Sequence, residues 1–260
     1  MQHPRYSRDP TLLLEILAAA DDVARTHFER GVDVRNKPDG SLVTDADIEA
    51  EKVILEGLRL YFPNDDLWSE ESGESAAVGE PSTHRWVVDP IDGTSAFVEG
   101  LAHWGPSLAR IDNSGRVLLA ATSVTRLREV WWVYEGRAYF GDKELPPLTT
   151  GAPQVLYIPS GLHKRAQLKW MGKARCIGGT AAHMALVARG SAMAVFVGPD
   201  WHLWDVAAGL GLIEAVKGVA RRLSDGAPLQ LLADVGAPFI AGNADVVEAL
   251  LSAGALGSKP

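Results

Sequence analysis

The stretch from 86 to 94, Trp-Val-Val-Asp-Pro-Ile-Asp-Gly-Thr, constrains the fold of this chain more than any other. An apolar run that predicts a strand ends at two carboxylates, Asp89 and Asp92, and the proline between them predicts a stiff turn. Carboxylate oxygens are the ligands that Mg²⁺ prefers, so the pair indicates a divalent-metal site. Gly93 lets backbone N–H groups approach an anion closely, and a helix starting near Ser95 would favour phosphate at its N-terminus.

An Asp-x-x-Asp turn on its own is ambiguous, because carboxylates that follow a strand are often turn formers or helix caps. Three further acidic segments favour the metal-site interpretation. Thr-Asp-Ala-Asp at 44–47 opens an amphipathic helix, and Trp-Ser-Glu-Glu-Ser-Gly at 68–73 pairs two acids. Trp-Asp-Val-Ala-Ala-Gly at 204–209 puts a lone Asp at the start of a helix of small residues.

Together with Asn-Lys-Pro-Asp at 36–39 and Ile-Ala-Gly-Asn at 240–243, these motifs resemble, in kind and order, those of the inositol monophosphatase family. The resemblance spans most of the chain. It implies an α+β fold, the five-layer α/β/α/β/α sandwich of the sugar phosphatases, with the site where two halves meet. Residues 1–150 would carry most metal ligands, and residues 151–260 would carry Asp205 and the substrate contacts, in one compact unit.

The resemblance also implies a set of metal ligands. Glu70, Asp89 and the Ile91 backbone carbonyl would hold one Mg²⁺. Asp89, Asp92 and Asp205 would hold a second, with Asp89 bridging the two. Two to three ions are expected, with Mn²⁺ able to substitute and with Li⁺ and Ca²⁺ inhibitory. Such ions neutralise phosphoryl oxygens, activate water and stabilise the leaving alkoxide.

The catalytic residues implied by the family pattern are Glu70 and Thr94, which would orient the attacking water, and Asp47, which would support Thr94 from behind. A last group would contact the phosphate or the rest of the substrate. It consists of Asp92, Gly93, Thr94, Ser95, Gly179, Thr180 and Ala181.

Composition limits the remaining classes of protein. The chain has 260 residues, 47% of them apolar, which is enough for a sizeable core. Its net charge of −8 argues against nucleic-acid and anionic-membrane partners, and no apolar run approaches the ~20 residues of a membrane span. We expect a cytoplasmic protein whose partner is a small-molecule phosphate ester, and the resemblance implies a homodimer. Cys176 is the only cysteine and is expected to be an inert core thiol.

Periodicity and turn residues predict the order of elements. Helices are expected over 11–30 and from an N-cap at Asp45 to the proline at 63. Strands of an antiparallel meander are expected over 86–88, 107–111, 117–122 and 130–134. After a proline-rich break at 145–153, the expected elements are strands at 154–158, 193–197 and 239–241 and helices at 180–187 and 205–216.

Several alternatives bear on the substrate. A basic run precedes Cys176 and could be a solvated helix face or a second anion subsite; it consists of Lys164, Arg165, Lys169, Lys173 and Arg175. Inositol-specific members of the family carry an acid where this chain has Gly198, which weakens the inositol assignment. Trp201 and Trp204 flank Asp205, and two interpretations stay open: one of them lines the substrate mouth, or they pack under the helix that carries Asp205.

The predicted function is therefore a Mg²⁺-dependent phosphomonoesterase that hydrolyses inositol phosphate, histidinol phosphate or a related sugar phosphate. The alternatives are a 3′(2′),5′-bisphosphate nucleotidase and a non-catalytic relative that binds small molecules. His183 and His202 are expected to be structural rather than metal ligands, because the oxygen ligands already suffice.

Overall fold

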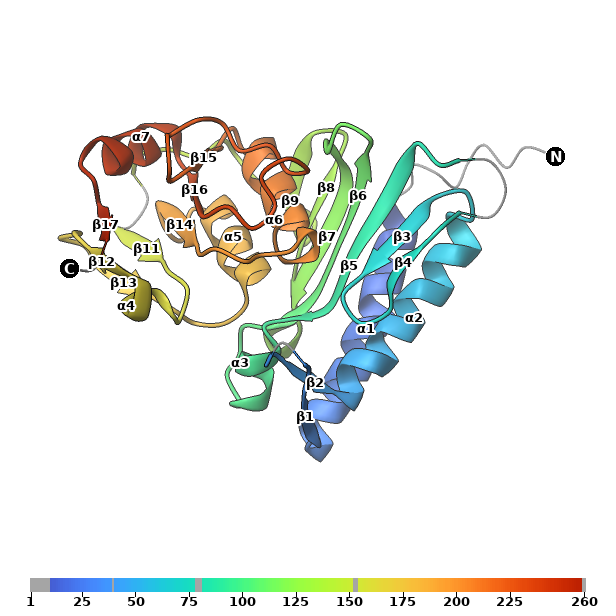
Figure 1. Cartoon of the computed structure of the whole chain (residues 1–260). Helices are drawn as coiled ribbons and strands as arrows, with labels where there is room; N and C mark the ends of the chain where they lie inside the picture. Colours follow the sequence, from blue (N-terminus) through green and yellow to red (C-terminus); the bar gives the residue numbers. More distant parts are fainter. Residues whose placement is uncertain (1–9, 39, 78–80, 152–153, 259–260) are drawn as a thin grey trace.

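Two β-sheets organise the protein. The computed structural model describes residues 10–38, 40–77, 81–151 and 154–258. The chain passes through an eight-stranded sheet first and a five-stranded sheet second (Figure 1). Two small pairs lie outside them, β1 (Val34–Asn36) with β2 (Leu42–Thr44) and β12 (Ala166–Leu168) with β17 (Leu256–Ser258).

The first sheet is mostly an antiparallel meander, as predicted, because short turns join strands of alternating apolar residues. β3 breaks the pattern by pairing in parallel with β5. In spatial order the strands are β10 (Lys143–Glu144), β9 (Arg137–Phe140), β8 (Glu129–Tyr134), β7 (Val117–Val124), β6 (Gly105–Asp112), β5 (His84–Asp92), β3 (Asp66–Ser69) and β4 (Gly73–Ser75). A 3₁₀ turn, η1 (Thr125–Leu127), links β7 to β8.

Two long helices, α1 (Pro10–Arg30) and α2 (Asp45–Tyr61), cover the outer face of this sheet (Figure 1). Apolar residues four apart form one stripe on each helix, and the stripes are buried against Trp86 of β5. The stripe residues include Leu13, Leu17, Ile54 and Leu58. This outer layer fixes α2 against the strand that carries Asp89 and Asp92.

Helices α5 (Thr180–Ala188) and α6 (Leu203–Ala215) form the layer between the two sheets (Figure 1). Every α5 residue after the first is buried. A helix that is apolar all round has no solvent face, and this explains why these two segments lack the polar stripe of α1. The largest hydrophobic cluster of the protein gathers around them.

The second sheet has the order β13 (Lys173–Arg175), β11 (Val155–Tyr157), β14 (Ala194–Val197), β16 (Phe239–Gly242) and β15 (Val219–Arg222). Helix α7 (Ala244–Ser252) packs on its far face, while the short α4 (Leu162–Arg165) lies beside β12. Two outer helices, a sheet, two inner helices, a sheet and an outer helix make five layers, so the predicted sandwich is confirmed. The division at residue 150 stays a prediction.

Local structure around the acidic motif differs from expectation. The Asp-Pro-Ile-Asp segment is not a turn but the end of β5, with a β-bulge between Asp89 and Asp92. A β-bulge can accommodate Pro90, because a residue in the bulge need not donate a backbone hydrogen bond to the neighbouring strand. Helix α3 (Thr94–Val98) then begins after Gly93, whose φ of 87° suits glycine. The N-cap of α2 is Thr44 rather than Asp45.

The segment before α5 also differs from expectation. Cys176 is exposed, so the expectation of a core thiol is wrong; it follows β13, an edge strand with little cover. The basic run is not one helix face either, because α4 ends at Arg165. Asp39, the end of the proline-rich break at 152–153 and the N-terminal residues 1–9 lie outside the described residues.

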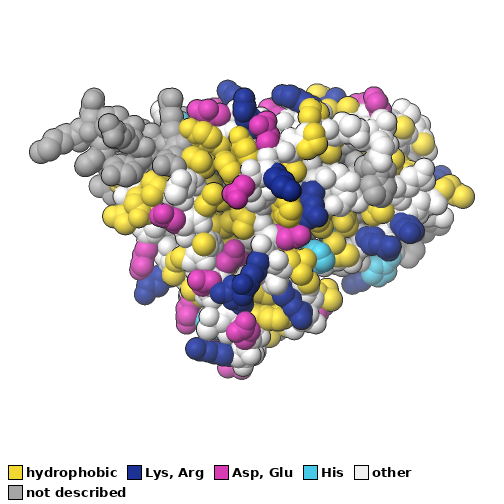
Figure 2. Space-filling view, turned by 180° about the vertical axis from the view of Figure 1, so that it is seen from behind, with side chains coloured by type: hydrophobic (Ala, Val, Ile, Leu, Met, Phe, Trp, Pro, Cys, Tyr) yellow, Lys and Arg dark blue, Asp and Glu magenta, His cyan; other side chains and the backbone are white. Residues whose placement is uncertain are grey.

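On the face seen in Figure 2, Lys and Arg side chains are scattered among acidic and apolar ones. None of the helices in the described ranges is both long enough and apolar enough to cross a membrane.

Candidate active site

Glu70 and Asp89 meet because β3 runs parallel to β5. Ser69 pairs with Val88, so the next residue of each strand emerges at the same edge of the sheet. The Glu70 N–H donates to the Val88 carbonyl at 3.1 Å and fixes this approach. Asp89 in turn accepts a 2.9 Å hydrogen bond from the Ile91 N–H, which orients its carboxylate at the bulge.

Asp92 joins this sheet edge to the inner helix α5. Its carboxylate accepts hydrogen bonds from the N–H groups of Thr180, at 2.9 Å, and Ala182, at 3.2 Å. The N-cap of α5 is Gly179, which has no side chain to cap the helix, so Asp92 supplies the acceptor from another element. A Cβ at Gly179 would lie 2.0 Å from Asp92 Oδ2, and this close contact requires glycine.

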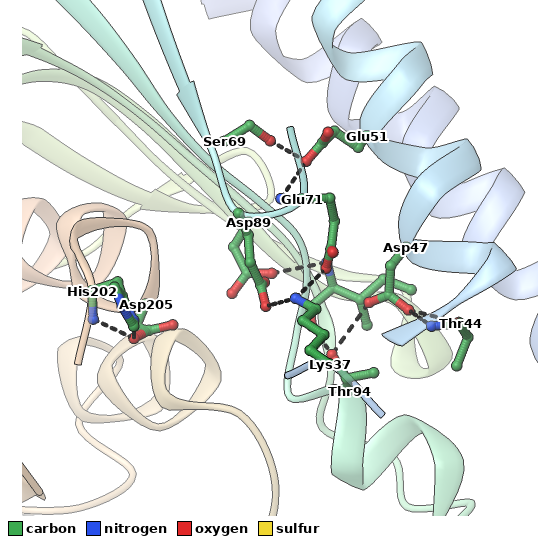
Figure 3. A network of polar contacts seen from close by, with 12 residues as sticks. Lys37, Thr44, Asp47, Glu51, Ser69, Glu71, Asp89, Thr94, His202 and Asp205 are labelled. Carbon is green, nitrogen blue, oxygen red and sulfur yellow. Dashed lines mark hydrogen bonds and ion pairs between the residues drawn. The ribbon is translucent and has the colours of Figure 1, made fainter. Parts of the chain in front are cut away.

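Asp205 enters from α6, where it is the third residue rather than the first. Its Oδ2 accepts a 2.6 Å hydrogen bond from the N–H of His202, the residue just before the helix. Figure 3 shows Asp205 on one side of Asp89 and Asp47 on the other.

Burial and mutual repulsion define the electrostatics of these acids. Burial, followed by the charges of Glu70, Asp92 and Asp205, raises the pKa of Asp89 well above its usual range. Burial, with the charge of Asp205 next, raises the pKa of Asp92 to about 7. Burial also raises the pKa of Asp205 to about 6. The cluster thus favours a cation that would relieve the repulsion.

Lys37, from the turn between β1 and β2, is a cation at this cluster. Its Nζ donates 2.7 Å hydrogen bonds to Glu70 and to Glu71 (Figure 3). Burial lowers the pKa of Lys37, but the bonds and charges of the two glutamates outweigh burial and raise it. Burial raises the pKa of Glu71 to about 7 despite the lysine. Glu71 is therefore a largely buried ion-pair partner of Lys37.

The Thr94 hydroxyl is held by Asp47, which is itself held by Thr44. Thr94 Oγ1 is 3.2 Å from both Asp47 Oδ1 and the Ile91 carbonyl oxygen. Asp47 Oδ2 accepts from the Thr44 N–H, at 2.7 Å, and from the Thr44 hydroxyl, at 2.6 Å. Asp47 is fully buried, so it can act only through Thr94.

The donor set fits a hard divalent cation, because it consists of carboxylate and carbonyl oxygens. In the described ranges, however, no three His, Cys, Asp or Glu side chains stand ready around one point. Asp92 and Asp205 face backbone N–H groups, and Glu70 faces Lys37. The ligand atoms are of the kind that a divalent metal ion binds, although in this structure the carboxylates are hydrogen-bonded to protein groups.

Glu70, Asp89, Asp92 and Asp205 line a cavity of about 800 Å³, which residues of both main sheets border. Trp201 lines it but is also buried in the core between the sheets, whereas Trp204 stacks on His202, so the role of a tryptophan at the mouth stays a prediction. Ala181 is fully buried and does not line the cavity, so its assignment as a substrate contact stays a prediction. The predicted residues on the wall are Glu70, Asp89, Ile91, Asp92, Gly93, Thr94, Ser95, Gly179, Thr180 and Asp205.

A second cavity of about 560 Å³ opens between β6, β7, β8 and the end of α6. It contains none of the predicted site residues, so the larger cavity is the candidate site. Gly198 lines that larger cavity. A Cβ atom added at Gly198 would have only the Pro159 side chain within 4 Å, so there is space at this position, but no acidic side chain fills it.

The structure adds two residues that the motifs left without a role, Lys37 and Glu51. Lys37 belongs to a family motif, yet nothing in the sequence showed that it reaches Glu70. Glu51 lies four residues after Asp47, and this helical spacing was the available signal. His183 is structural as expected, because its Nε2 accepts from the Ile177 N–H at 3.1 Å inside the core.

The five-layer fold and a carboxylate cluster beside a cavity define the class of sugar-phosphatase-like proteins. The sequence profile described as the inositol monophosphatase family matches residues 10–253, and the chain belongs to this family. As a family member it is a phosphoric monoester hydrolase, of a family that is generally metal-dependent and processes small phosphate esters.

Comparisons with individual proteins agree on the family and differ in substrate. The chain is 30% identical to a histidinol-phosphatase of Chlorobaculum parvum, over 81% of this chain and 84% of that protein. It is 31% identical to the 3′(2′),5′-bisphosphate nucleotidase CysQ of Shigella flexneri, over 68% and 75%. A 36% match covers 58% of this chain but only 57% of a Streptomyces griseus protein named glucose-1-phosphate thymidylyltransferase.

Among solved structures, the extragenic suppressor protein SuhB from Bartonella henselae is similar, with a TM-score of 0.82. The alignment covers 94% of this chain and 96% of that chain at 23% identity, so it shows the shared fold.

Proposed function

We propose that this protein is a Mg²⁺-dependent phosphomonoesterase that hydrolyses a small polar phosphate ester. The observation that carries the proposal is the convergence of Glu70, Asp89, Asp92 and Asp205, from the edge of the first sheet and the inner helix α6, on the wall of the 800 Å³ cavity. Buried structural acids are usually paired with cations; among the described residues, the ion pairs of Lys37 are with Glu70 and Glu71, and Asp89, Asp92 and Asp205 are in no ion pair with Lys or Arg.

Glu70, Asp89 and the Ile91 carbonyl would hold one Mg²⁺, and Asp89, Asp92 and Asp205 would hold another. When bound, Mg²⁺ would neutralise the phosphoryl oxygens, lower the pKa of water and stabilise the leaving oxygen. Two or three ions, replaceable by Mn²⁺ and opposed by Li⁺ and Ca²⁺, are part of this proposal.

The protein itself would position the reactants. Glu70 and the Thr94 hydroxyl would orient the attacking water, because Thr94 Oγ1 is held by Asp47 beside the Ile91 carbonyl. The N–H groups of Gly93, Thr94 and Ser95 would bind the phosphate. The hydroxyl of Thr180 would contact the rest of the substrate, whereas its N–H is already used by Asp92.

The proposed substrate class is supported by the other residues that line the cavity. Inositol phosphate, histidinol phosphate or a related sugar phosphate is the leading group. Gly198 offers no carboxylate that could bind ring hydroxyls, so the leaving group would contact apolar side chains on this part of the wall instead. Those side chains include Phe196, Pro199, Trp201 and Pro238.

A second candidate, a bisphosphate nucleotidase, is favoured by two cations on the wall. Lys164 and Arg165 of α4 line the cavity, and Arg165 pairs with the exposed Asp200 at 3.3 Å. A second phosphate could take the place of that carboxylate. Lys169 lies outside the wall and serves as the control.

The test is phosphate release from histidinol phosphate, inositol 1-phosphate, adenosine 3′,5′-bisphosphate and fructose 1,6-bisphosphate, with Mg²⁺ or with EDTA. Metal-dependent turnover of one or two of them is expected. Arg165→Glu should raise KM for the bisphosphate about tenfold or more, and for a monophosphate much less, if a second anion binds there. Lys169→Glu should change neither value. Equal effects on both substrates would remove the nucleotidase candidate, and no turnover at all would contradict the proposal for these esters.

A further inference from the structure

Glu51 is a buried carboxylate at the site that has no role in the mechanism above. It lies on α2 and is 3% exposed. Its carboxylate accepts hydrogen bonds from the hydroxyls of Ser69 and Ser72, and at 2.9 Å from the N–H of Glu71. One side chain therefore holds both ends of the turn at 69–72 and a residue between them. Figure 3 shows the contacts of Glu51 with Ser69 and Glu71.

This turn joins β3 to β4 and carries Glu70 into the wall of the cavity, with Glu71 next to it in the chain. The Glu71 N–H is partly buried, and its acceptor is Glu51. A donor that loses its acceptor away from water is destabilised, so without Glu51 the turn would adopt other conformations.

Helix α2 also fixes the other side of the site. Asp47 and Glu51 are four residues apart, so they lie on the same helix face about 6 Å apart along the axis. Asp47 holds the hydroxyl of Thr94, and Glu51 holds the turn that carries Glu70. One rigid helix thus sets the position of Glu70 relative to Thr94.

We propose that Glu51 is a positioning residue, which fixes the turn at 69–72 so that Glu70 faces Asp89 and Thr94 in the geometry that a divalent cation and the substrate require. The expected effect of Glu51 on metal binding rests on the proposed function. The expected effect of Glu51 on the turn does not, so metal binding and the conformation of the turn are measured separately.

The first experiment uses the metal-free protein and measures hydrogen exchange at the Glu71 amide. Glu51→Ala removes all three contacts and should speed exchange about tenfold or more. Ser72→Ala removes one contact and should give a smaller change in the same direction. Glu56→Gln, at an exposed position of the same helix, is the matched control and should leave exchange unchanged.

The second experiment measures the Mg²⁺ concentration that gives half of the metal-induced shift in Tm. Loss of a group that orients a metal ligand typically weakens metal binding about 10- to 100-fold, and Glu51→Ala should fall in this range. Glu51→Gln should be closer to wild type, since its amide oxygen can still accept from Glu71 and Ser69. Glu56→Gln should match wild type.

The outcomes separate the two claims. Unchanged exchange at Glu71 in both Glu51→Ala and Ser72→Ala would overturn the positioning role, whatever the metal does. A lower Tm in Glu51→Ala with unchanged exchange and unchanged Mg²⁺ dependence would overturn it in favour of simple core stability. A wild-type protein that shows no Mg²⁺-induced shift would instead contradict the proposed function, while the exchange result would still decide the role in the turn. If Glu51→Ala does not fold, Ser72→Ala, which keeps Glu51 in place and removes one of its donors, still gives both readouts.

Discussion

His183 should make the stability of this protein depend on pH in a way that one substitution removes. The side chain lies in α5, is 3% exposed and stacks on Tyr157 of β11 with ring centroids 4.8 Å apart. Burial, followed by the nearby charge of His103, lowers its pKa from 6.5 to about 4. The imidazole is therefore neutral in the folded protein, and its Nε2 accepts from the Ile177 N–H.

The sign and size of the effect follow from proton linkage. The unfolded chain takes up a proton at this histidine near pH 6.5, whereas the folded protein resists until about pH 4. Stability from this group is fully present above pH 6.5 and is lost as pH falls through the window down to about 4. Between pH 7.5 and 5.0 the loss from His183 alone is about 2 kcal/mol.

The assay is urea unfolding of the wild type and of His183→Gln at pH 7.5, 6.0 and 5.0. The glutamine oxygen can accept from Ile177 but does not titrate, so the variant should start less stable and lose about 2 kcal/mol less over this range. His163→Gln, at an exposed position of α4, is the control and should follow the wild type. Parallel pH profiles for wild type and His183→Gln would refute the reasoning.

Three further substitutions test the site. Asp92→Asn should lower kcat about a hundredfold or more with an unchanged far-UV circular dichroism spectrum, and a rate above about a tenth of wild type would contradict the role of this ligand. Thr94→Val, which removes the hydroxyl beside Asp47, should lower kcat about tenfold or more with little change in KM, and steady-state kinetics would check this. Gly179→Ala should cost about 1–3 kcal/mol in urea unfolding, because its Cβ would lie 2.0 Å from Asp92 Oδ2. Gly161→Ala, with nothing within 4 Å of its Cβ, should stay within about 0.5 kcal/mol of wild type.

Local patterns were enough to predict most of the layers. The helix and strand ranges after residue 154 agree with α5, α6, β11, β14 and β16 within two residues at each end. Apolar spacing and turn residues carry that information along the chain. The five-layer arrangement itself came from the family resemblance, because the order of layers depends on contacts between distant segments.

Long-range contacts account for what the sequence did not show. The parallel pairing of β3 with β5 joins segments separated by β4, and no local signal selects that partner. Asp92 was expected as a metal ligand, but its two bonds to the start of α5 depend on Gly179 approaching it in space. Nothing local in the sequence distinguishes Glu51 from other acids on its helix, because its three hydrogen-bond donors come close to it only in the folded protein.

The most direct test of the central claim is calorimetric titration of Mg²⁺ into the metal-free wild type and into Asp89→Asn. Asp89 is the residue that would bridge the two ions. The account therefore predicts that the wild type binds at least two ions and that Asp89→Asn binds neither of them with the wild-type affinity. Equal stoichiometry and affinity in the two proteins, or no Mg²⁺ binding by the wild type, would contradict it.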